Sequence, residues 1–318
     1  MSNKPVDVVV VGELNVDIIL NKIEGFPAVG KEIIANTMHV TLGSSSAIFA
    51  SNLSSLSANV AFIGRIGNDN FAKLVLESLN RRHVETSHIV TSATSSTGAT
   101  IVLTYDQDRA NVTYPGAMNE LCIDDIDFRF LSGARHLHFS SYFMQPGIRK
   151  DVTTLFRKAR ELGLTTSLDT QWDPDEKWDI PLQELLPFVT LFMPNSQELL
   201  HMTRAGSIGE GIRILQPFAN HIIVKNGSNG AVAWDGQNLI EQPAFMNDNP
   251  VDTIGAGDSF NAGFIKGFIN GEPVRKCLEL GALTGAISTT KAGGTGAFES
   301  PETVSEIASE KFNYHFRP

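Results

Sequence analysis

The sequence contains few of the residues that mark a secreted, metal-binding or nucleic-acid-binding protein. It has two cysteines, Cys122 and Cys277, which are far apart and fit no metal-ligand spacing, so we expect two core residues in a reducing compartment. Its 25 lysines and arginines are outnumbered by 35 aspartates and glutamates. The resulting net charge of -10 argues against nucleic acid or an anionic membrane as a partner.

Long apolar runs and two common nucleotide-binding motifs are also missing. The apolar run Val8 to Val11 is bracketed by Asp7 and Glu13, so we interpret it as neither a signal peptide nor a membrane span and expect a cytoplasmic location. Gly12-Glu13-Leu14 stands where a dinucleotide-binding dehydrogenase would carry Gly-x-Gly-x-x-Gly after its first strand. The Gly-Lys-Ser/Thr loop of a P-loop kinase is absent as well.

What is present is an alternation of buried strands and helices in a chain of 318 residues, long enough for one large α/β domain. The β-branched run Val6 to Val11 predicts a strand buried on both faces. Predicted strands at 136–139, 164–168, 189–193 and 221–224 alternate with predicted helices at 147–162 and 196–203. This pattern predicts a doubly wound, mostly parallel sheet flanked by helices.

Further elements are predicted around this core. The predicted strands lie at 59–63, 84–90, 97–105, 111–114 and 231–234, and a turn is predicted at 64–69. The predicted helices are one that follows this turn and ends near 82, two at about 44–56 and 274–290, and one polar helix after 301. The helix at 274–290 is expected to be closed by the glycines after Lys291. The tip at 105–109, which includes Arg109, is expected to be a solvated turn.

Strands placed directly after the first strand, at 18–20 and 32–42, predict a small lid sheet rather than another strand–helix unit. We therefore predict a single domain over residues 1–318. Its lid strands, at about 17–42 and 97–115, would be inserted into the α/β body.

The stretch from Val251 to Asn261 places the small turn Gly255-Ala256-Gly257 before an apolar run with helical spacing. Such a turn directs free backbone N–H groups of a helix N-terminus at one point, which suits an anion. Asp258 at its rim would repel a phosphate but could accept a proton from a hydroxyl that attacks one. The stretch therefore predicts a phosphoryl-transfer site; the alternative is an ordinary N-cap and tight turn.

Two polar segments near the N-terminus are candidates for binding a hydroxylated ligand. Asn15 and Asp17 follow the first strand and share a face in extended chain, so they could hold adjacent hydroxyls, or they could form a polar turn. The run Gly43-Ser44-Ser45 could let a ligand approach a helix N-terminus, or it could be a plain serine cap.

Three later features also have two interpretations. Asn195 with Glu198 is a capping box or an Mg²⁺ site near phosphates. The turn from Lys225 to Gly230 wraps a nucleotide or closes a hairpin. His136 and His138 alternate along one strand, and without a third ligand we interpret them as core histidines.

The order Asp252-Thr253-x-Gly255-Ala256-Gly257-Asp258-Ser259-Phe260 resembles the signature of the PfkB/ribokinase family of carbohydrate kinases. Other motifs match that family in the same order along nearly the whole chain. They are Gly12-x-x-Asn15-x-Asp17, the small-residue segment at Gly43, Gly64-Arg65-Ile66-Gly67-Asn68-Asp69, Asn195-x-x-Glu198 and Gly227-Ser228-x-Gly230.

This resemblance implies a ribokinase-like domain that phosphorylates a sugar hydroxyl with ATP and Mg²⁺ and forms a homodimer through its lid. It implies that Asp258 is the general base and that Gly255, Ala256 and Gly257 supply the anion hole. The sugar would be held by Asn15, Asp17, Gly43, Ser44, Ser45 and Asp258.

The resemblance also implies sites for ATP and metal ions. ATP would be bordered by Asn195, Lys225, Gly227, Ser228, Gly230, Gly257 and Ala282, with Mg²⁺ near Glu198 and Asn195. A monovalent cation such as K⁺ would lie near Asp252, Ile254, Ser288, Lys291, Gly293 and Ala297.

Departures from the family bear on the substrate. Family members that phosphorylate ribose usually carry Gly-Gly-Lys-Gly-Ala-Asn where this chain has Gly43-Ser44-Ser45-Ser46-Ala47-Ile48, and a glutamate where it has Ser140 and Ser141. No basic cluster suits a second phosphate, with Arg65, Arg109 and Lys31 as possible exceptions. We therefore expect an uncharged or acid monosaccharide; the alternatives are a nucleoside kinase or an inactive sugar-sensing protein.

Overall fold

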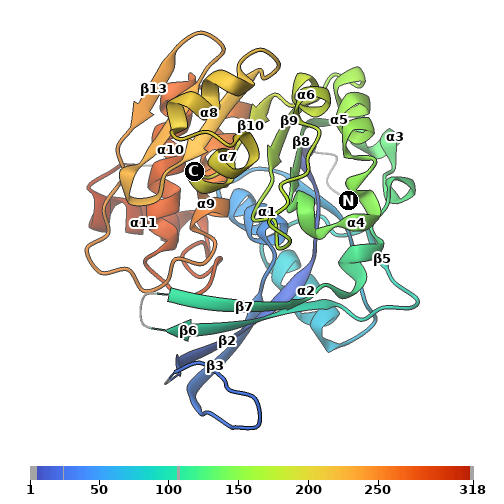
Figure 1. Ribbon diagram of the computed structural model, residues 1–318, viewed down its shortest axis with the longest axis vertical. Coiled ribbons are helices and arrows are strands. Elements are labelled where there is room, and N and C mark those ends of the chain that lie inside the picture. The colour runs from blue at the N-terminus through green and yellow to red at the C-terminus, as the bar shows by residue number, and fades with distance from the viewer. Residues whose placement is uncertain (1–5, 24, 106–107, 316–318) are drawn as a thin grey trace.

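A nine-stranded sheet runs through the body of the computed structural model, which describes residues 6–23, 25–105 and 108–315 (Figure 1). Its order is β13 (Leu239–Gln242), β12 (Ala231–Trp234), β11 (His221–Lys225), β10 (Leu191–Phe192), β9 (Thr165–Asp169), β8 (Ala134–Ser140), β1 (Val6–Val11), β4 (Val60–Ile66) and β5 (Ile89–Thr91). Neighbours from β11 to β5 pair in parallel, whereas β12 and β13 are antiparallel. The predicted doubly wound sheet is confirmed.

Helices cover both faces of this sheet because β1 is apolar on both. Val8 and Val10 pack into one core with α1 (Ser45–Ser55), α2 (Asn70–Arg81), α9 (Ala256–Ile269), α10 (Val274–Ser288) and α11 (Pro301–Phe312). Val9 and Val11 pack into the other core with α3 (Phe128–Leu131), α4 (Pro146–Arg149), α5 (Val152–Glu161), α6 (Leu182–Leu185), α7 (Ser196–Thr203) and α8 (Ile208–Leu215). Single 3₁₀ turns lie at Gly116–Glu120, Ile123–Asp125, Tyr142–Met144, Leu186–Phe188 and Gly227–Asn229.

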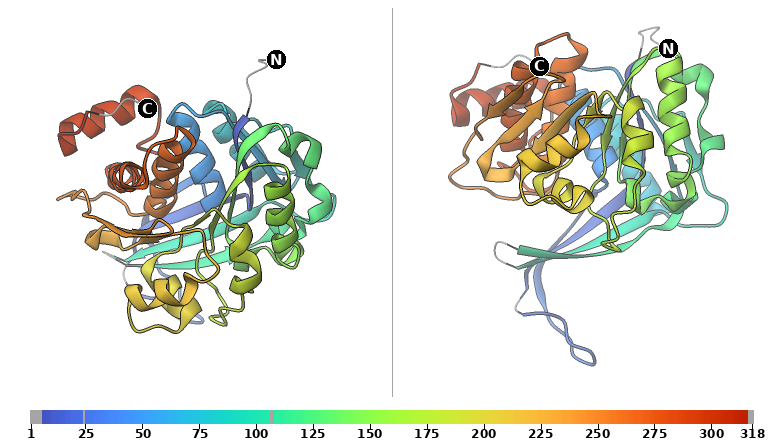
Figure 2. Two further views of the ribbon diagram at one scale, coloured as in Figure 1. Left: turned by 90° about the horizontal axis from the view of Figure 1, so that it is seen from above. Right: turned by 45° about the horizontal axis from the view of Figure 1, so that its top comes forward.

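A second sheet, here called the small sheet, lies across one end of the body (Figures 1 and 2). Its order is β3 (Ala35–Leu42), β2 (Asn15–Ile23), β6 (Gly98–Tyr105) and β7 (Asp108–Tyr114), with β2 and β6 parallel and the other pairs antiparallel. Residues 25–34 extend away from the body (Figure 2). The register aligns Thr41, Asp17, Thr100 and Thr113 in one row and Val40, Ile18, Ile101 and Val112 in the next. Because neighbours along a strand point to opposite faces, the small sheet has a polar face and an apolar face.

Several predicted element boundaries were wrong. Gly64–Ile66 belong to β4 rather than to a turn, since they pair with β5, and β5, Ile89–Thr91, shares only Ile89 and Val90 with the predicted strand 84–90. The single helix predicted at 147–162 is two helices, because the chain makes a tight turn in which the Asp151 N–H donates to the Ile148 carbonyl at 2.8 Å. The helix predicted to reach 290 ends at Ser288 without a glycine cap, since Thr289 closes it in right-handed conformation.

The predicted core histidines are confirmed, whereas only one of the two predicted core cysteines lies in the core. His136 and His138 are fully buried, and burial lowers the pKa of each to about 3, so they are neutral core residues. Cys277 is buried, Cys122 is partly buried, and both are free thiols. Among the described residues no helix is long and apolar enough to cross a membrane. Within the predicted tip at 105–109, residues 106 and 107 lie outside the described residues, and Arg109 belongs to β7.

Candidate functional site

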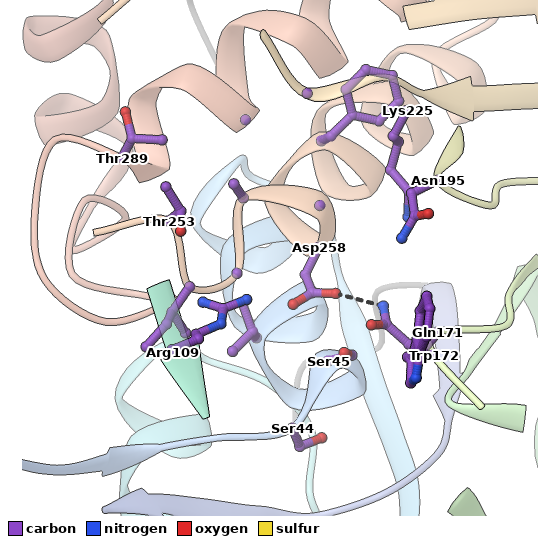
Figure 3. Close-up of a pocket in the computed structure, with 18 of the residues that line it drawn as sticks. Ser44, Ser45, Arg109, Gln171, Trp172, Asn195, Lys225, Thr253, Asp258 and Thr289 are labelled. Carbon is purple, nitrogen blue, oxygen red and sulfur yellow. Dashed lines mark hydrogen bonds between the residues drawn. The ribbon is translucent and has the colours of Figure 1, made fainter. Parts of the chain in front are cut away.

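A cavity of about 710 Å³ separates the carboxyl ends of the main-sheet strands from the polar face of the small sheet. Most of the predicted site residues line it: Asn15, Asp17, Ser44, Ser45, Asn195, Glu198, Lys225, Gly227, Ser228, Gly230, Ile254, Gly255, Ala256, Gly257, Asp258 and Ala282. Figure 3 shows several of these side chains converging on Asp258 from different elements. The fold thus gathers residues that are spread over 268 sequence positions, from 15 to 282, around one space.

The N-terminus of α9 forms the centre of one cavity wall. Gly255 is its N-cap and has a left-handed φ of 71°. A Cβ at Gly255 would lie 2.7 Å from the Cα of Gly294 and 3.0 Å from Cγ2 of Ile48, so only glycine fits. The first-turn N–H groups of a helix have no partners within it. The Ala256 N–H donates to the Thr253 carbonyl at 3.3 Å, a long hydrogen bond that an anion at the helix start could replace.

Asp258 lies in the first turn of α9 and is 7% exposed. The Gln171 side-chain amide donates to its Oδ1 at 3.2 Å, the dashed line in Figure 3. Burial, and then the negative charge of Asp169, raise the pKa of Asp258 to about 8, while Lys225 acts in the opposite direction. A carboxylate with so high a pKa is a stronger base than an ordinary aspartate.

Asn15 and Asp17 point from β2 towards the cavity, as predicted from their alternate spacing. Asn15 donates to the Thr100 hydroxyl at 2.7 Å, and its own amide oxygen is buried without a partner among the described residues. Burial raises the pKa of Asp17 to about 6 although Arg109 lowers it. Gly43 does not line the cavity. A Cβ at Gly43 would lie 2.3 Å from the Asp17 carboxylate, so this glycine makes room for the side chains of Asn15 and Asp17.

The start of α1 is fixed by a buried network. Ser44 caps the helix by accepting the Ala47 N–H at 3.0 Å, and its hydroxyl donates to the Glu13 carbonyl at 2.6 Å. The Glu13 carboxylate accepts the Ser46 N–H at 3.1 Å. Ser45 lines the cavity, and a hydrogen bond from it helps to lower the pKa of Asp258. The predicted serine cap is confirmed; Ser44 and Ser45 also line the cavity, and the ligand-binding interpretation stays a prediction.

Asn195 and Glu198 form the capping box of α7 and also line the cavity. Glu198 accepts the backbone and side-chain amides of Asn195 at 2.9 Å and 2.6 Å. Burial and the nearby Asp169 charge raise the pKa of Glu198 to about 7. Lys225 lies beside them because its N–H donates to the Pro194 carbonyl at 3.0 Å.

The six positions named for a monovalent cation divide into two groups. Asp252 accepts the N–H groups of Ile254 and Gly293, both at 2.9 Å, and the Ser288 hydroxyl lies 3.4 Å from the Ile254 carbonyl, so these four are adjacent. Ala297 is buried, and the Lys291 ammonium is directed to Glu299 at 3.3 Å. Among the described residues no cluster of three His, Cys, Asp or Glu side chains could hold a metal ion.

The sequence analysis missed several residues at the cavity. Gln171 lines the cavity just beyond the carboxyl end of β9, and Asp169, the fully buried last residue of β9, lies behind it; the rule that ligands bind at such strand ends could have identified both. Arg109 is exposed, but it lies on β7 and faces the cavity from the small sheet (Figure 3), so the prediction that it belongs to a turn was wrong. Glu13 and Trp172 line the cavity too, without any sequence signal that singles them out.

Comparison with known proteins gives a consistent result. Residues 6–301 match the family described as pfkB family carbohydrate kinase. The chain is 28% identical over 308 residues to an ATP-dependent ribose-1-phosphate kinase of Halopiger xanaduensis (95% of this chain, 98% of the relative). It is 25% identical over 321 residues to a 5-dehydro-2-deoxygluconokinase of Geobacillus thermodenitrificans (96% and 93%). The structure of Arabidopsis thaliana ribokinase complexed with ribose and ATP superimposes with a TM-score of 0.82 at 23% identity (96% and 99%).

Proposed function

The chain belongs to the pfkB family of carbohydrate kinases and is a phosphotransferase, and from this premise we propose that Asp258 is the base that activates a monosaccharide hydroxyl. The observation that supports this most is the placement of Asp258, a buried carboxylate of raised pKa at an open helix N-terminus that faces a polar cavity wall. The hydroxyl gives its proton to Asp258 while its oxygen bonds to the γ-phosphorus of ATP. The bond between that phosphorus and the β,γ-bridging oxygen breaks, and ADP leaves.

The backbone N–H groups of the Gly255-Ala256-Gly257 turn stabilise the charge on the transferred phosphoryl group. They are held at the start of α9 by a left-handed glycine and by close packing against Gly294, so they need not reorganise during the reaction. The positive end of the helix dipole adds to the same effect.

The nucleotide lies on the opposite side of Asp258 from the small sheet, along Asn195, Gly227, Ser228, Gly230 and Ala282. Glu198 is an oxygen ligand of the kind that Mg²⁺ prefers, it faces the cavity, and Asn195 fixes its orientation. Mg²⁺, when bound with ATP, neutralises phosphate charge. The adjacent Asp252, Ile254, Ser288 and Gly293 fit a monovalent cation through backbone carbonyls, with Lys291 and Ala297 at its margin.

The polar face of the small sheet acts as a lid over the sugar, and its charges favour a sugar acid. Asp17 and Asn15 can hold hydroxyls, while Arg109 supplies one guanidinium from β7. One guanidinium matches a carboxylate in charge and fork geometry, whereas a phosphate carries nearly twice that charge. The Geobacillus relative is named for a sugar acid, and the Halopiger relative for a phosphosugar, so both belong in the test.

The apolar face of the small sheet is proposed to pair with a second copy of the chain. Ile101 and Val112 are 41% and 62% exposed, and Met38 on the same face is 62% exposed. Exposed apolar patches of this kind mark interaction surfaces, and a two-fold dimer is the commonest way to cover them.

The experiment is ADP release from Mg-ATP over a panel of aldoses, ketoses, sugar acids, phosphosugars and nucleosides, with and without K⁺, beside Asp258→Asn. Turnover of one sugar acid by the wild type alone would support substrate and base together. Turnover of nucleosides alone would favour the nucleoside kinase. Binding of a sugar without turnover would favour the sensing protein and contradict the proposed function.

A further inference from the structure

A buried ion pair between Asp169 and Lys225 lies near Asp258; Lys225 is expected to border ATP, but neither charge has yet been given a part in the transfer step. Asp169 is the last residue of β9 and is fully buried; Lys225 is the last residue of β11, with a side chain that is 11% exposed. The Lys225 ammonium and the Asp169 carboxylate are in contact. Because the two strands are parallel and separated only by β10, their carboxyl ends bring the side chains to the same edge of the sheet.

The carboxylate of Asp169 is held from a third element as well. The side-chain amide of Asn261, on α9, donates to the same oxygen of Asp169 at 2.5 Å, and the Gln171 N–H lies 3.3 Å from the other oxygen. A buried carboxylate is stable only when it is paired and hydrogen-bonded, and Asp169 meets both conditions. The ion pair is therefore a fixed part of the site rather than a mobile surface contact.

The position of the ammonium distinguishes this pair from an ordinary structural ion pair. Lys225 Nζ lies 3.8 Å from the point that a Cβ of Gly257 would occupy, over the first turn of α9. This is the turn whose N–H groups face the cavity, and Lys225 lines the same cavity. A cation at this point would lie beside any anion that those N–H groups receive.

Lys225 remains charged at neutral pH despite its burial. Burial works against the ammonium form, but the charges of Asp169 and then Glu198, with the hydrogen bond that Lys225 donates to Asp169, hold the pKa of Lys225 above its ordinary value. Among the described residues that line the cavity, the other cation is Arg109, which lies on the small sheet. Lys225 is thus the cation that the body of the protein supplies to the site.

We propose, building on the proposed kinase function, that Lys225 is a catalytic residue whose ammonium contacts the transferred phosphoryl group, and that Asp169 and Asn261 are positioning residues that hold it there. Phosphoryl transfer gathers negative charge on the phosphoryl oxygens and the leaving oxygen, and a fixed cation stabilises that charge. Lys225 keeps its protons throughout, since the proton of the sugar hydroxyl goes to Asp258. Asp169 also raises the basicity of Asp258 through its charge.

The alternative is that Lys225 serves only to neutralise Asp169. A paired set of variants separates the two roles. Lys225→Met alone leaves Asp169 buried without its cation and can fail to fold. Lys225→Met combined with Asp169→Asn removes both charges, and the new asparagine can still accept the Asn261 amide, so the fold is retained.

In the double variant we expect a folded protein whose kcat falls about 10²–10³-fold while the sugar KM changes little, the pattern of a lost transition-state interaction. Recovery of kcat to within about threefold of the wild type would overturn the proposal, since charge balance alone would then suffice. The surface pair Lys276 and Glu279, 2.9 Å apart on α10, is the matched control: Lys276→Met with Glu279→Gln should leave kcat unchanged.

A second readout is the pH profile of Asp169→Asn, which keeps Lys225. Removing the charge of Asp169 should lower the pKa of Asp258, so the acidic limb of kcat/KM should move to lower pH. An unmoved limb would contradict the positioning role of Asp169. The outcomes separate this inference from the proposed function. If the wild type is active, Asp258→Asn is inactive and the double variant is active, only this inference is refuted. If the wild type is inactive, the proposed function and this inference are refuted together.

Discussion

The two walls of the cavity are built in different ways. The wall formed by the body carries Glu198 and Asp258 in the first turns of two helices, with Asp169 behind them at the end of β9, and each of the three is less than 10% exposed. The wall formed by the small sheet carries Asp17 and Arg109 on one face of strands whose other face is apolar and exposed.

This difference indicates a division of labour. The charges that we propose to act on the phosphoryl group are buried in the body of the protein, and this burial keeps them in place. The groups that we propose to select the sugar lie on the small sheet, where substitutions can change the substrate without unfolding the body. Variants on the body wall should therefore affect kcat, and variants on the small sheet should affect KM.

The strongest test of the body wall is Asp258→Asn. We expect kcat to fall by about 10²–10⁴-fold, the usual contribution of a general base, while the affinity for ATP stays nearly the same. Steady-state kinetics and ATP titration calorimetry measure the two quantities. Asp235→Asn, in an exposed turn after β12, is the control and should behave as the wild type. Near-normal turnover in Asp258→Asn would remove this residue from the mechanism.

Gly255→Ala tests whether the anion-binding turn tolerates any side chain. The new Cβ would meet Gly294 and Ile48 in a residue of positive φ, so we expect about a 10²-fold loss of kcat as the N–H groups move. Gly271→Ala carries the same positive φ with open space around it, so it should lose some stability but no activity. Equal activity of the two variants would show that the turn is not the anion hole.

Arg109→Ala tests the cavity wall that the small sheet forms. If the substrate is a sugar acid, its KM should rise about 10- to 100-fold with a much smaller change in kcat, because a charge-assisted contact made in both ground and transition states is lost. Lys31→Ala, on the loop of the same sheet, should leave KM unchanged. A fall in kcat at constant KM would instead mean that Arg109 acts on the transfer step, as the residues of the body wall do. The proposed difference in role between the two walls would then be wrong.

Val112→Glu tests the outer face of the small sheet. A charge in this apolar row should shift the protein from dimer to monomer in light scattering at micromolar concentration, with kcat changed by less than about threefold. Leu239→Glu, on β13 and 56% exposed, introduces the same charge on an edge of the main sheet and should leave the mass unchanged. A wild type that is already monomeric would contradict the dimer.

The smallest expected effect concerns stability. Because the pKa of Asp258 is raised in the folded state, the protonated carboxyl stabilises the fold and this contribution disappears as pH rises towards about 8. Asp258→Asn should therefore be more heat-stable than the wild type at pH 8.5, and the difference should shrink at pH 5. A difference that grows on acidification would mean that the Asp258 pKa is not raised.

Much of the fold could be predicted because its signals are local. The β-branched run of β1, the capping box of α7 and the glycine turn before α9 each lie within a few consecutive residues. Errors occurred where packing decides the boundary, as in the break between α4 and α5 and in the extension of β4 through Gly64, which pairs with β5.

The sequence by itself determined the turn that we propose to bind an anion, together with its carboxylate, because Gly255 to Asp258 are consecutive and their geometry follows from one helix start. It also placed Asn15 and Asp17 on one face, since a strand alternates. Only the tertiary structure joined Asp169, Lys225 and Asn261 and turned Arg109 into the cavity. Those residues come from strands and helices far apart in the chain, and no spacing along a sequence records which strand ends meet.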